Sequence, residues 1–281
     1  MYSYNIMEWL LFFYIYCFFG WVWECLYVSV CKAKWVNRGF MHGPFLPIYG
    51  TGAVIMLFLT IPVKNSIVVT FLVGMTGATI LEFVTGVLME KMFGVRYWDY
   101  SNCFMNFHGH ICLQASLLWG FFSVLLVNVI HALVEKGIGH LSFCSIQVLG
   151  IIVTAIFSAD FSAAFREALD LKELLINLTE SHEELRVIEK RVEAVASAIG
   201  NEVKEKSTET LAQLNKALEN NKQRVVEYKE KMHHLYETTG NIRYYTRSMR
   251  LLRRNPDAVS GRYRQALKEL IRQADKNKRN Q

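Results

Sequence analysis

Residues 65–89 read NSIVVTFLVGMTGATILEFVTGVLM, an apolar stretch that holds a single charged side chain, that of Glu82. A helix needs about 20 mostly apolar residues to cross a bilayer. Four other stretches also meet this requirement, and they lie at residues 5–30, 44–63, 111–134 and 143–165. The short link around Pro62 and Asn65 separates two of the stretches, because both residue types favour helix ends. The sequence therefore predicts an all-α integral membrane helix bundle of about five spans within residues 1–165.

A second glutamate, Glu24, interrupts the apolar stretches at a depth similar to that of Glu82. Glu24 lies eight residues before Lys32, and Glu82 lies nine residues before Lys91. At about 1.5 Å per residue, each glutamate is about 12–14 Å along its helix from the lysine that follows it. A charge inside a bilayer is costly and is usually retained for a pathway, an ion pair or a reaction. Each carboxyl group therefore needs a partner or a proton.

A loop that contains an arginine follows each of these two helices. The first arginine loop, residues 32–50, includes Arg38, and the second arginine loop, residues 92–112, includes Arg96. Both loops are too apolar and aromatic for solvated linkers. Irregular backbone at membrane depth is stable only where protein or trapped water satisfies its polar groups. We therefore expect both loops to fold back into the bundle as re-entrant or plug-like segments.

The polar residues of the helices and loops define a candidate site. Arg38 and Arg96 are the candidate partners of the two glutamates, and the carboxylate of Asp99 can accept from an arginine. Two interpretations stay open: a buried ion network that fixes loop geometry, or a substrate or proton path that histidines join, since histidine titrates near neutrality. The candidate residues are Glu24, Arg38, His42, Glu82, Arg96, Trp98, Asp99, Asn106 and His108.

We expect no metal, no cofactor and no catalytic residue in this site. The six cysteines show neither a CxxC motif nor the spacing of a zinc site. Two histidines that flank one glycine near a cysteine are weak support for a metal site. We expect most of the cysteines to be small apolar residues in helix packing.

Charge in the loops predicts the orientation. With five spans, the two arginine loops share one side of the membrane with the C-terminal tail. Together with Lys91, which directly precedes the second loop, they carry five Lys or Arg, whereas the opposite loops carry two. Basic loops are retained on the cytoplasmic side. We therefore expect a multi-pass protein of the cell membrane with its N-terminus outside, and with the tail and both arginine loops in the cytoplasm.

From Leu171 onward, the apolar residues follow a heptad pattern. They recur at alternating steps of three and four over residues 171–199, where Ser181 fills one position, and again over residues 211–235, where Asn221 fills one, with charged residues between them. This spacing is typical of coiled coils and permits self-association. The register breaks near Gly200-Asn201, which favours a turn. We therefore expect a coiled-coil hairpin over residues 166–237, and a single helix with a stutter is the alternative.

The final segment, residues 238–281, is strongly basic. It carries twelve Lys or Arg against three acidic residues. We expect it to be helical, with a basic face that is either solvated or bound to the anionic lipid surface of the inner leaflet. No nucleic-acid recognition module accompanies the charge, so we expect no nucleic-acid partner.

The two arginine loops resemble those of the CmpB-like membrane proteins described as putative ABC-transporter type IV. Segments similar to the first family signature are Arg38-Gly39-Phe40, Gly43-Pro44 and Pro47-Ile48-Tyr49-Gly50. Residues similar to the second are Trp98-Asp99-Tyr100-Ser101, Asn106, Gly109 and Cys112-Leu113. The resemblance covers about residues 9–135 and implies an ABC permease component, but it assigns no substrate and no catalytic residue.

Three functional hypotheses remain. The chain has no P-loop motif, so a permease-like component with a polar site on its cytoplasmic side would need a separate ATPase subunit. The alternative is a membrane-anchored scaffold or sensor that recruits partners through its coiled-coil tail. The third is an intramembrane enzyme that acts on a lipid or its head group with Glu82 or Asp99 as the acid or base. We favour the first over an enzyme, because no pair of nucleophile and base is found.

Overall fold

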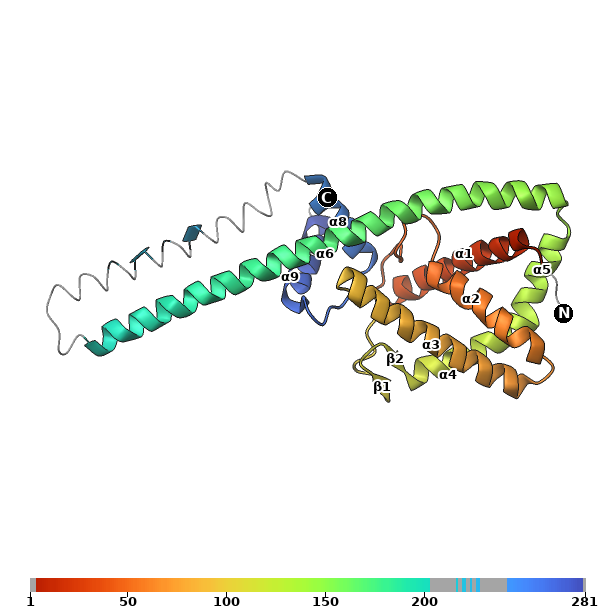
Figure 1. Ribbon diagram of the computed structural model, residues 1–281, viewed down its shortest axis with the longest axis horizontal. Coiled ribbons are helices and arrows are strands. Elements are labelled where there is room, and N and C mark those ends of the chain that lie inside the picture. The colour runs from red at the N-terminus through yellow and green to blue at the C-terminus, as the bar shows by residue number, and fades with distance from the viewer. Residues whose placement is uncertain are drawn as a thin grey trace.

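The computed structural model describes residues 4–202 and 242–279, together with six isolated residues between them (Figure 1). Helices dominate the described residues, and two very short strands form one antiparallel hairpin. The membrane half consists of α1 (Ile6–Cys31), α2 (Pro47–Thr60) with the 3₁₀ turn η1 (Ile61–Val63), α3 (Ile67–Phe93), β1 (Asn106–Phe107), β2 (Ile111–Cys112), α4 (Leu113–Leu125), the π-helical turn η2 (Leu126–Ile130) and α5 (His131–Gly139).

Four described helices are long and apolar enough to cross a membrane. They are Ile6–Cys31, Ile67–Phe93, Leu113–Gly139 and the first part of α6, Phe143–Glu184. The prediction of an all-α membrane bundle is therefore confirmed. The remaining apolar stretch forms the shorter helix Pro47–Val63, which measures about 26 Å by its rise per residue. The count of five spans stays a prediction, because it depends on this short helix.

Close helix contacts fix the geometry of the bundle around the two arginine loops. A side chain at Gly50 of α2 would place its Cβ 2.4 Å from Sγ of Cys17 in α1. A side chain at Gly74 of α3 would place its Cβ 2.2 Å from Cβ of Ser123 in α4. At both positions only glycine lets the helices approach closely, as is common between membrane helices.

Both arginine loops lie at the same end of the bundle, which we call the loop end. The helix α3 stops there because Gly94 adopts a left-handed conformation (φ 72°) that ends helices. Two residues later, the chain reaches Arg96. A guanidinium nitrogen of Arg38 donates to the backbone carbonyl oxygen of Tyr97, so the two loops touch each other.

The last apolar helix continues without interruption into the tail. α6 (Phe143–Glu202) contains 60 residues and is about 90 Å long. It first runs beside α1 and then extends well past the loop end (Figure 1). α6 is described as far as Glu202, so the turn expected near Gly200-Asn201 lies at the limit of the described residues and stays a prediction. The second heptad run lies almost wholly outside the described residues, so the choice between a hairpin and a single helix stays a prediction.

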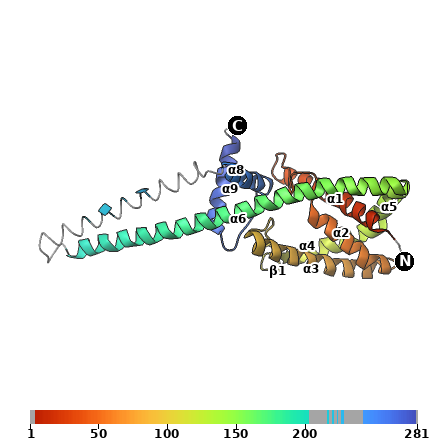
Figure 2. The same ribbon diagram turned by 45° about the horizontal axis from the view of Figure 1, so that its top comes forward.

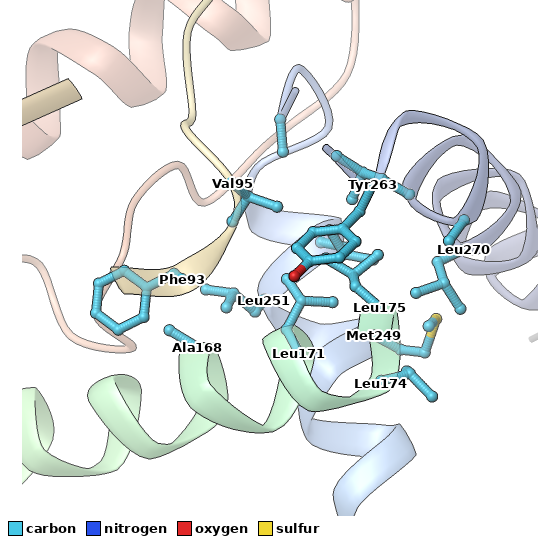
Figure 3. Packing of buried hydrophobic residues seen from close by; sticks show 14 of the residues in the cluster. Phe93, Val95, Ala168, Leu171, Leu174, Leu175, Met249, Leu251, Tyr263 and Leu270 are labelled. Atoms are coloured by element: carbon cyan, nitrogen blue, oxygen red, sulfur yellow. The ribbon is translucent and has the colours of Figure 1, made fainter. Parts of the chain in front are cut away.

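The basic C-terminal segment folds back onto the loop end. It forms α8 (Ile242–Arg254) and α9 (Arg264–Arg279), which pack against α6 at this end (Figure 2). Leu171 and Leu174 from the first heptad run are almost fully buried in the same hydrophobic core as side chains of α8 and α9 (Figure 3). Leu178 belongs to the same core. The start of the heptad seam is therefore covered by the C-terminal helices.

Candidate functional site

The first arginine loop is anchored to α1. The backbone N–H of Arg38 donates to Sγ of Cys25 at 3.1 Å. Further along the loop, the backbone N–H of Leu46 donates to the carbonyl oxygen of Cys17 at 3.0 Å. The loop therefore folds back against the helix that precedes it.

A carboxyl group of α6 holds the middle of the first loop. Asp160 accepts from the backbone N–H groups of His42 and Gly43 at 3.2 and 2.8 Å, and its Oδ1 lies 2.8 Å from Nδ1 of His42. The other ring nitrogen of His42 lies 3.0 Å from Oε1 of Glu167. His42 therefore bridges two acidic side chains of α6.

The second arginine loop closes around Arg96. The guanidinium donates to the carbonyl oxygen of His108 at 2.9 Å and to Oδ1 of Asp99 at 3.1 Å. The indole N–H of Trp98 donates to the carbonyl oxygen of His110 at 2.9 Å. Arg96 and Trp98 thus tie the start of the loop to its β1–β2 hairpin.

Asp99 and Asn106 shape the turn inside this loop. Asp99 accepts from both the backbone N–H and the hydroxyl of Ser101. Burial alone would raise the pKa of Asp99, but these hydrogen bonds and the charge of Arg96 lower it below its ordinary value. The side-chain amide of Asn106 donates to the carbonyl oxygens of Ser101 and Cys103 at 3.1 and 3.0 Å. Both residues therefore have structural roles in the turn.

His110 is buried between the second loop and α3. A Cβ at Gly86 would lie 2.8 Å from Nδ1 of His110, so the ring fits only against glycine. Its Nε2 lies 3.5 Å from Oε2 of Glu90. Burial and the positive charge of Arg96 lower the pKa of His110 below its ordinary value, although the Glu90 carboxylate opposes this shift.

Glu24 has both a cationic and a neutral partner. Its carboxylate lies 3.8 Å from Nε of Arg38 and accepts from the Tyr49 hydroxyl at 2.7 Å. The structure therefore places one of the two candidate arginines beside Glu24. The tyrosine comes from the first turn of α2, which begins at Pro47 within the last residues of the first arginine loop.

Glu82 has neutral donors as its described partners, and Arg96 is held by other carboxylates. The Glu82 side chain is buried, and it accepts from the Tyr100 hydroxyl at 2.9 Å and from Nε1 of Trp119 at 3.1 Å. Arg96 instead lies 3.6 Å from Glu90 and 3.1 Å from Asp99. Because these two carboxylates lie nearer the loop, they hold the guanidinium away from the buried glutamate.

The two glutamates belong to one continuous chain of contacts. The rings of Tyr49 and Trp119 lie 5.9 Å apart, and each ring bears a donor to one of the two carboxyl groups. We call the set Glu24, Tyr49, Trp119, Glu82 and Tyr100 the carboxyl–aromatic chain. Members of this chain come from α1, α2, α3, α4 and the second arginine loop.

Sequence reasoning did not single out three members of this chain. Tyr49 and Tyr100 stand within the motifs but were not predicted to be site residues. Trp119 gives only a weak signal, since the N–H of a tryptophan in an apolar span needs an acceptor. A stronger signal is that the arginine follows the glutamate by fourteen positions in both helix–loop units, from Glu24 to Arg38 and from Glu82 to Arg96.

The nine candidate residues divide into three groups. Glu24 and Glu82 belong to the carboxyl–aromatic chain, and Arg38 lies beside it. His42 faces the acidic residues of α6. The residues that build the second loop are Arg96, Trp98, Asp99, Asn106 and His108. Within the described ranges, no group of three or more His, Cys, Asp or Glu is arranged to hold a metal ion.

The sequence of this helix bundle matches that of a known family. Residues 11–165, which include both arginine loops and every member of the carboxyl–aromatic chain, match the family described as "Putative ABC-transporter type IV". The chain belongs to this family. Its match to the ABC-transporter type IV family confirms the resemblance and ends within α6, before the tail. Searches of curated proteins and of solved structures found no match.

Proposed function

We propose that this protein is the permease-like membrane component of an ABC-type transporter and that the carboxyl–aromatic chain is its polar site. Membership of the ABC-transporter type IV family and the four helices of spanning length support a membrane protein of the transporter class. The observation that carries the proposal is the contact chain between two carboxyl groups on separate apolar helices. A structural ion pair would not require two acids linked by aromatic donors across the bundle.

In this proposal the arginine loops form the gate at the loop end. Each loop follows a helix that bears a glutamate. The first loop leads into Tyr49, whose hydroxyl donates to Glu24, and the second loop contains Tyr100, whose hydroxyl donates to Glu82. A movement of either loop would therefore alter the hydrogen bonding of a buried carboxyl group. The charge of the loops supports a cytoplasmic position for this gate.

The proposed partners follow from the same arrangement. A separate ATPase subunit would bind at the cytoplasmic loop end, since nucleotide is available there. Residues of α8 and α9 that remain exposed include Arg250, Arg264 and Lys268. The apolar sides of these helices are used in the hydrophobic core, so anionic lipid would bind through the basic sides alone. Self-association would use the heptads beyond the core.

Purification from native membranes tests the proposal. We expect the full-length protein to co-purify with an ATPase, whose ATP hydrolysis in lipid nanodiscs requires this chain. Glu82→Gln should reduce the coupled hydrolysis about tenfold or more, whereas Glu184→Gln, on an exposed part of α6, should have no effect. If no ATPase co-purifies, or if Glu82→Gln is fully active, the permease proposal fails.

A sensor or scaffold is the second candidate, and the unbroken helix α6 favours it. Because α6 joins a membrane span directly to the tail, force or binding at the tail would reach the bundle. Deletion of residues 166–281 cannot separate the two candidates, since it removes the partners of Phe93 and Val95 in the core.

A shorter replacement does separate the permease from the sensor. Residues 186–241 can be exchanged for a flexible Gly-Ser linker, because α8 is held beside α6 by other contacts, such as Nη1 of Arg247 at 3.7 Å from Oδ2 of Asp170. The permease proposal expects this variant to retain coupled ATP hydrolysis. The sensor proposal expects the variant to insert normally but to lose function.

A further inference from the structure

The C-terminal segment contacts both arginine loops through an apolar core. Leu251 and Leu270, from α8 and α9, are almost completely buried with Phe93 and Val95 at the start of the second loop (Figure 3). Leu175 of α6 belongs to the same core. The core therefore joins a segment more than 140 residues downstream to the end of a membrane helix.

Polar contacts attach this segment to the first arginine loop. The side-chain amide of Asn255 donates to the carbonyl oxygen of Gly39 at 2.9 Å, and Asn255 is almost fully buried. Asp257 lies 2.8 Å from Nζ of Lys32 and 3.8 Å from Nη1 of Arg38. Asp257 thus shares Arg38 with Glu24 of the proposed polar site.

The same connection between α8 and α9 pairs with the second arginine loop. The backbone N–H of Arg96 donates to the carbonyl oxygen of Val259 at 2.9 Å, and the N–H of Val259 donates back at 2.8 Å. The N–H of Gly261 donates to Oε1 of Glu90 at 3.0 Å. This short antiparallel bridge fixes the backbone at Arg96 itself.

A buried ion pair anchors the end of α8. Nη2 of Arg254 donates to Oε2 of Glu167 at 2.7 Å, and both side chains are buried. The other oxygen of Glu167 contacts His42 of the first loop. Because removal of one member leaves a buried charge without its partner, this pair is the most sensitive point of the attachment.

We infer that residues 242–279 form a lid that holds both arginine loops at the loop end and must detach before the loops can move. The attachment also contains incompletely satisfied groups. Nη1 of Arg38, Nε of Arg254 and the Tyr97 hydroxyl are buried without a hydrogen-bond partner in the described part of the chain. Unmet buried donors destabilise the docked state, so a lid with such contacts is suited to release. The control of transport by this lid rests on the proposed function, but its docking does not.

Chemical cross-linking of the native protein measures the docking directly. Lys32 and Asp257 form an ion pair whose side chains are 28% and 50% exposed, so a water-soluble carbodiimide can reach them. The reagent takes up a carboxylate oxygen as it becomes a urea, and the Lys32 amine forms an amide bond with the Asp257 carbonyl carbon. We expect mass spectrometry of the full-length protein in membranes to detect this cross-linked pair. Asp257→Asn should abolish the cross-link.

Three variants then test whether the buried contacts keep the lid docked. Arg254→Gln and Asn255→Ala should each lower the cross-linking yield at least about threefold and speed hydrogen exchange at the Arg96–Val259 bridge about tenfold or more. Thr246→Ala, at an exposed position of α8 outside the basic surface, is the control and should change neither. If Arg254→Gln fails to accumulate in the membrane, Asn255→Ala provides the test alone.

Two results would overturn the lid. One is the absence of the Lys32–Asp257 cross-link in the native protein, and the other is unchanged yield and exchange in Asn255→Ala. Neither measurement depends on transport or on an ATPase. A failure of the permease proposal would therefore leave the lid standing, and a failure of the lid would leave the carboxyl–aromatic chain intact.

Discussion

Tyr49, Tyr100 and Trp119 explain how two acidic side chains are accommodated in an apolar bundle. A buried carboxyl group needs hydrogen bonds, and each glutamate of the chain receives at least one from an aromatic donor. Glu24 has a guanidinium nearby, whereas Glu82 relies on neutral donors alone among its described contacts. The two acids therefore differ in their electrostatic surroundings although their motifs are alike.

Replacement of Trp119 by phenylalanine tests the role of its N–H group. Trp119→Phe keeps an aromatic ring but removes the donor to Glu82, so we expect the free energy of unfolding to fall by about 1–3 kcal/mol. Chemical denaturation in detergent measures this change. Trp35→Phe, at an exposed tryptophan, is the control and should be neutral within about 0.5 kcal/mol. Equal effects of the two substitutions would contradict the assignment.

His110 gives the second loop a predictable dependence on pH. Its pKa is lowered in the folded protein, so the unfolded chain binds a proton first as the pH falls below about 6.5. Stability must then decrease with acidification. Asp99, whose folded pKa is also lowered, adds to this loss only below its ordinary value of 3.8. We expect thermal stability to fall between pH 7.5 and 5.5, and a smaller fall in His110→Gln; an equal fall in both would exclude His110 as the cause.

At the residue scale, the sequence indicates which charged residues belong to the site better than it indicates which groups they contact. The proximity of Arg38 and Glu24 could be predicted, because both are rare charges at one end of the bundle. The donors to Glu82 could not be predicted, since Trp119 lies 37 residues away and is one aromatic residue among many in the spans. Neutral donors leave no charge pattern in a sequence.

At the scale of single elements, helix packing sets the position of the second arginine loop. The buried ring of His110 and the indole of Trp98 lie against Gly86 of α3, where an added Cβ would be 2.8 and 3.3 Å from their nearest atoms. The loop can therefore pack against α3 only where that helix lacks a side chain. This contact brings Tyr100 of the same loop within reach of Glu82.

The substitution Gly86→Ala should push the second loop away from α3. Overpacking of this kind costs about 1–3 kcal/mol of stability. Gly137→Ala is a matched control, because nothing lies within 4 Å of its added Cβ, and alanine stabilises a helix by about 0.5–1 kcal/mol. Thermal unfolding of both variants in detergent distinguishes these effects. If Gly86→Ala is as stable as Gly137→Ala, the loop does not pack as described.

The helices of the bundle could be predicted from apolar length, because a span leaves a long uninterrupted signal. The ends of the helices could be predicted less well. The apolar stretch stops at residue 89, whereas α3 continues to Phe93. The continuity of α6 was also missed, since the change from apolar to charged residues after residue 165 does not by itself interrupt a helix.

At the scale of the whole molecule, the basic C-terminal segment belongs to the same folded unit as the loop end. Charge dominates its sequence and conceals the apolar stripes of α8 and α9, whose buried residues include Leu251, Leu252, Leu267 and Leu270. The apolar stripes do not indicate which residues they pack against, because Phe93 and Val95 lie more than 140 residues earlier in the sequence. Only the folded chain brings these elements together.

Truncation of one core leucine tests this unity. Leu252→Ala, at a side chain that is 1% exposed, should lower the free energy of unfolding by about 2–5 kcal/mol. Leu169→Ala, at an exposed leucine of α6, should cost much less. Unfolding can be followed at the second arginine loop by hydrogen exchange. An effect confined to α8 and α9, with no change at the loop, would show that the C-terminal segment folds separately.

An experimental structure of the full-length protein in lipid nanodiscs, determined by electron cryomicroscopy at side-chain resolution, tests the central claim most directly. We predict that Tyr49 and Trp119 lie in ring contact within the bundle, with their donors directed at Glu24 and Glu82. Density that shows the two glutamates directed toward the acyl chains, with both arginine loops extended into water, would contradict the account.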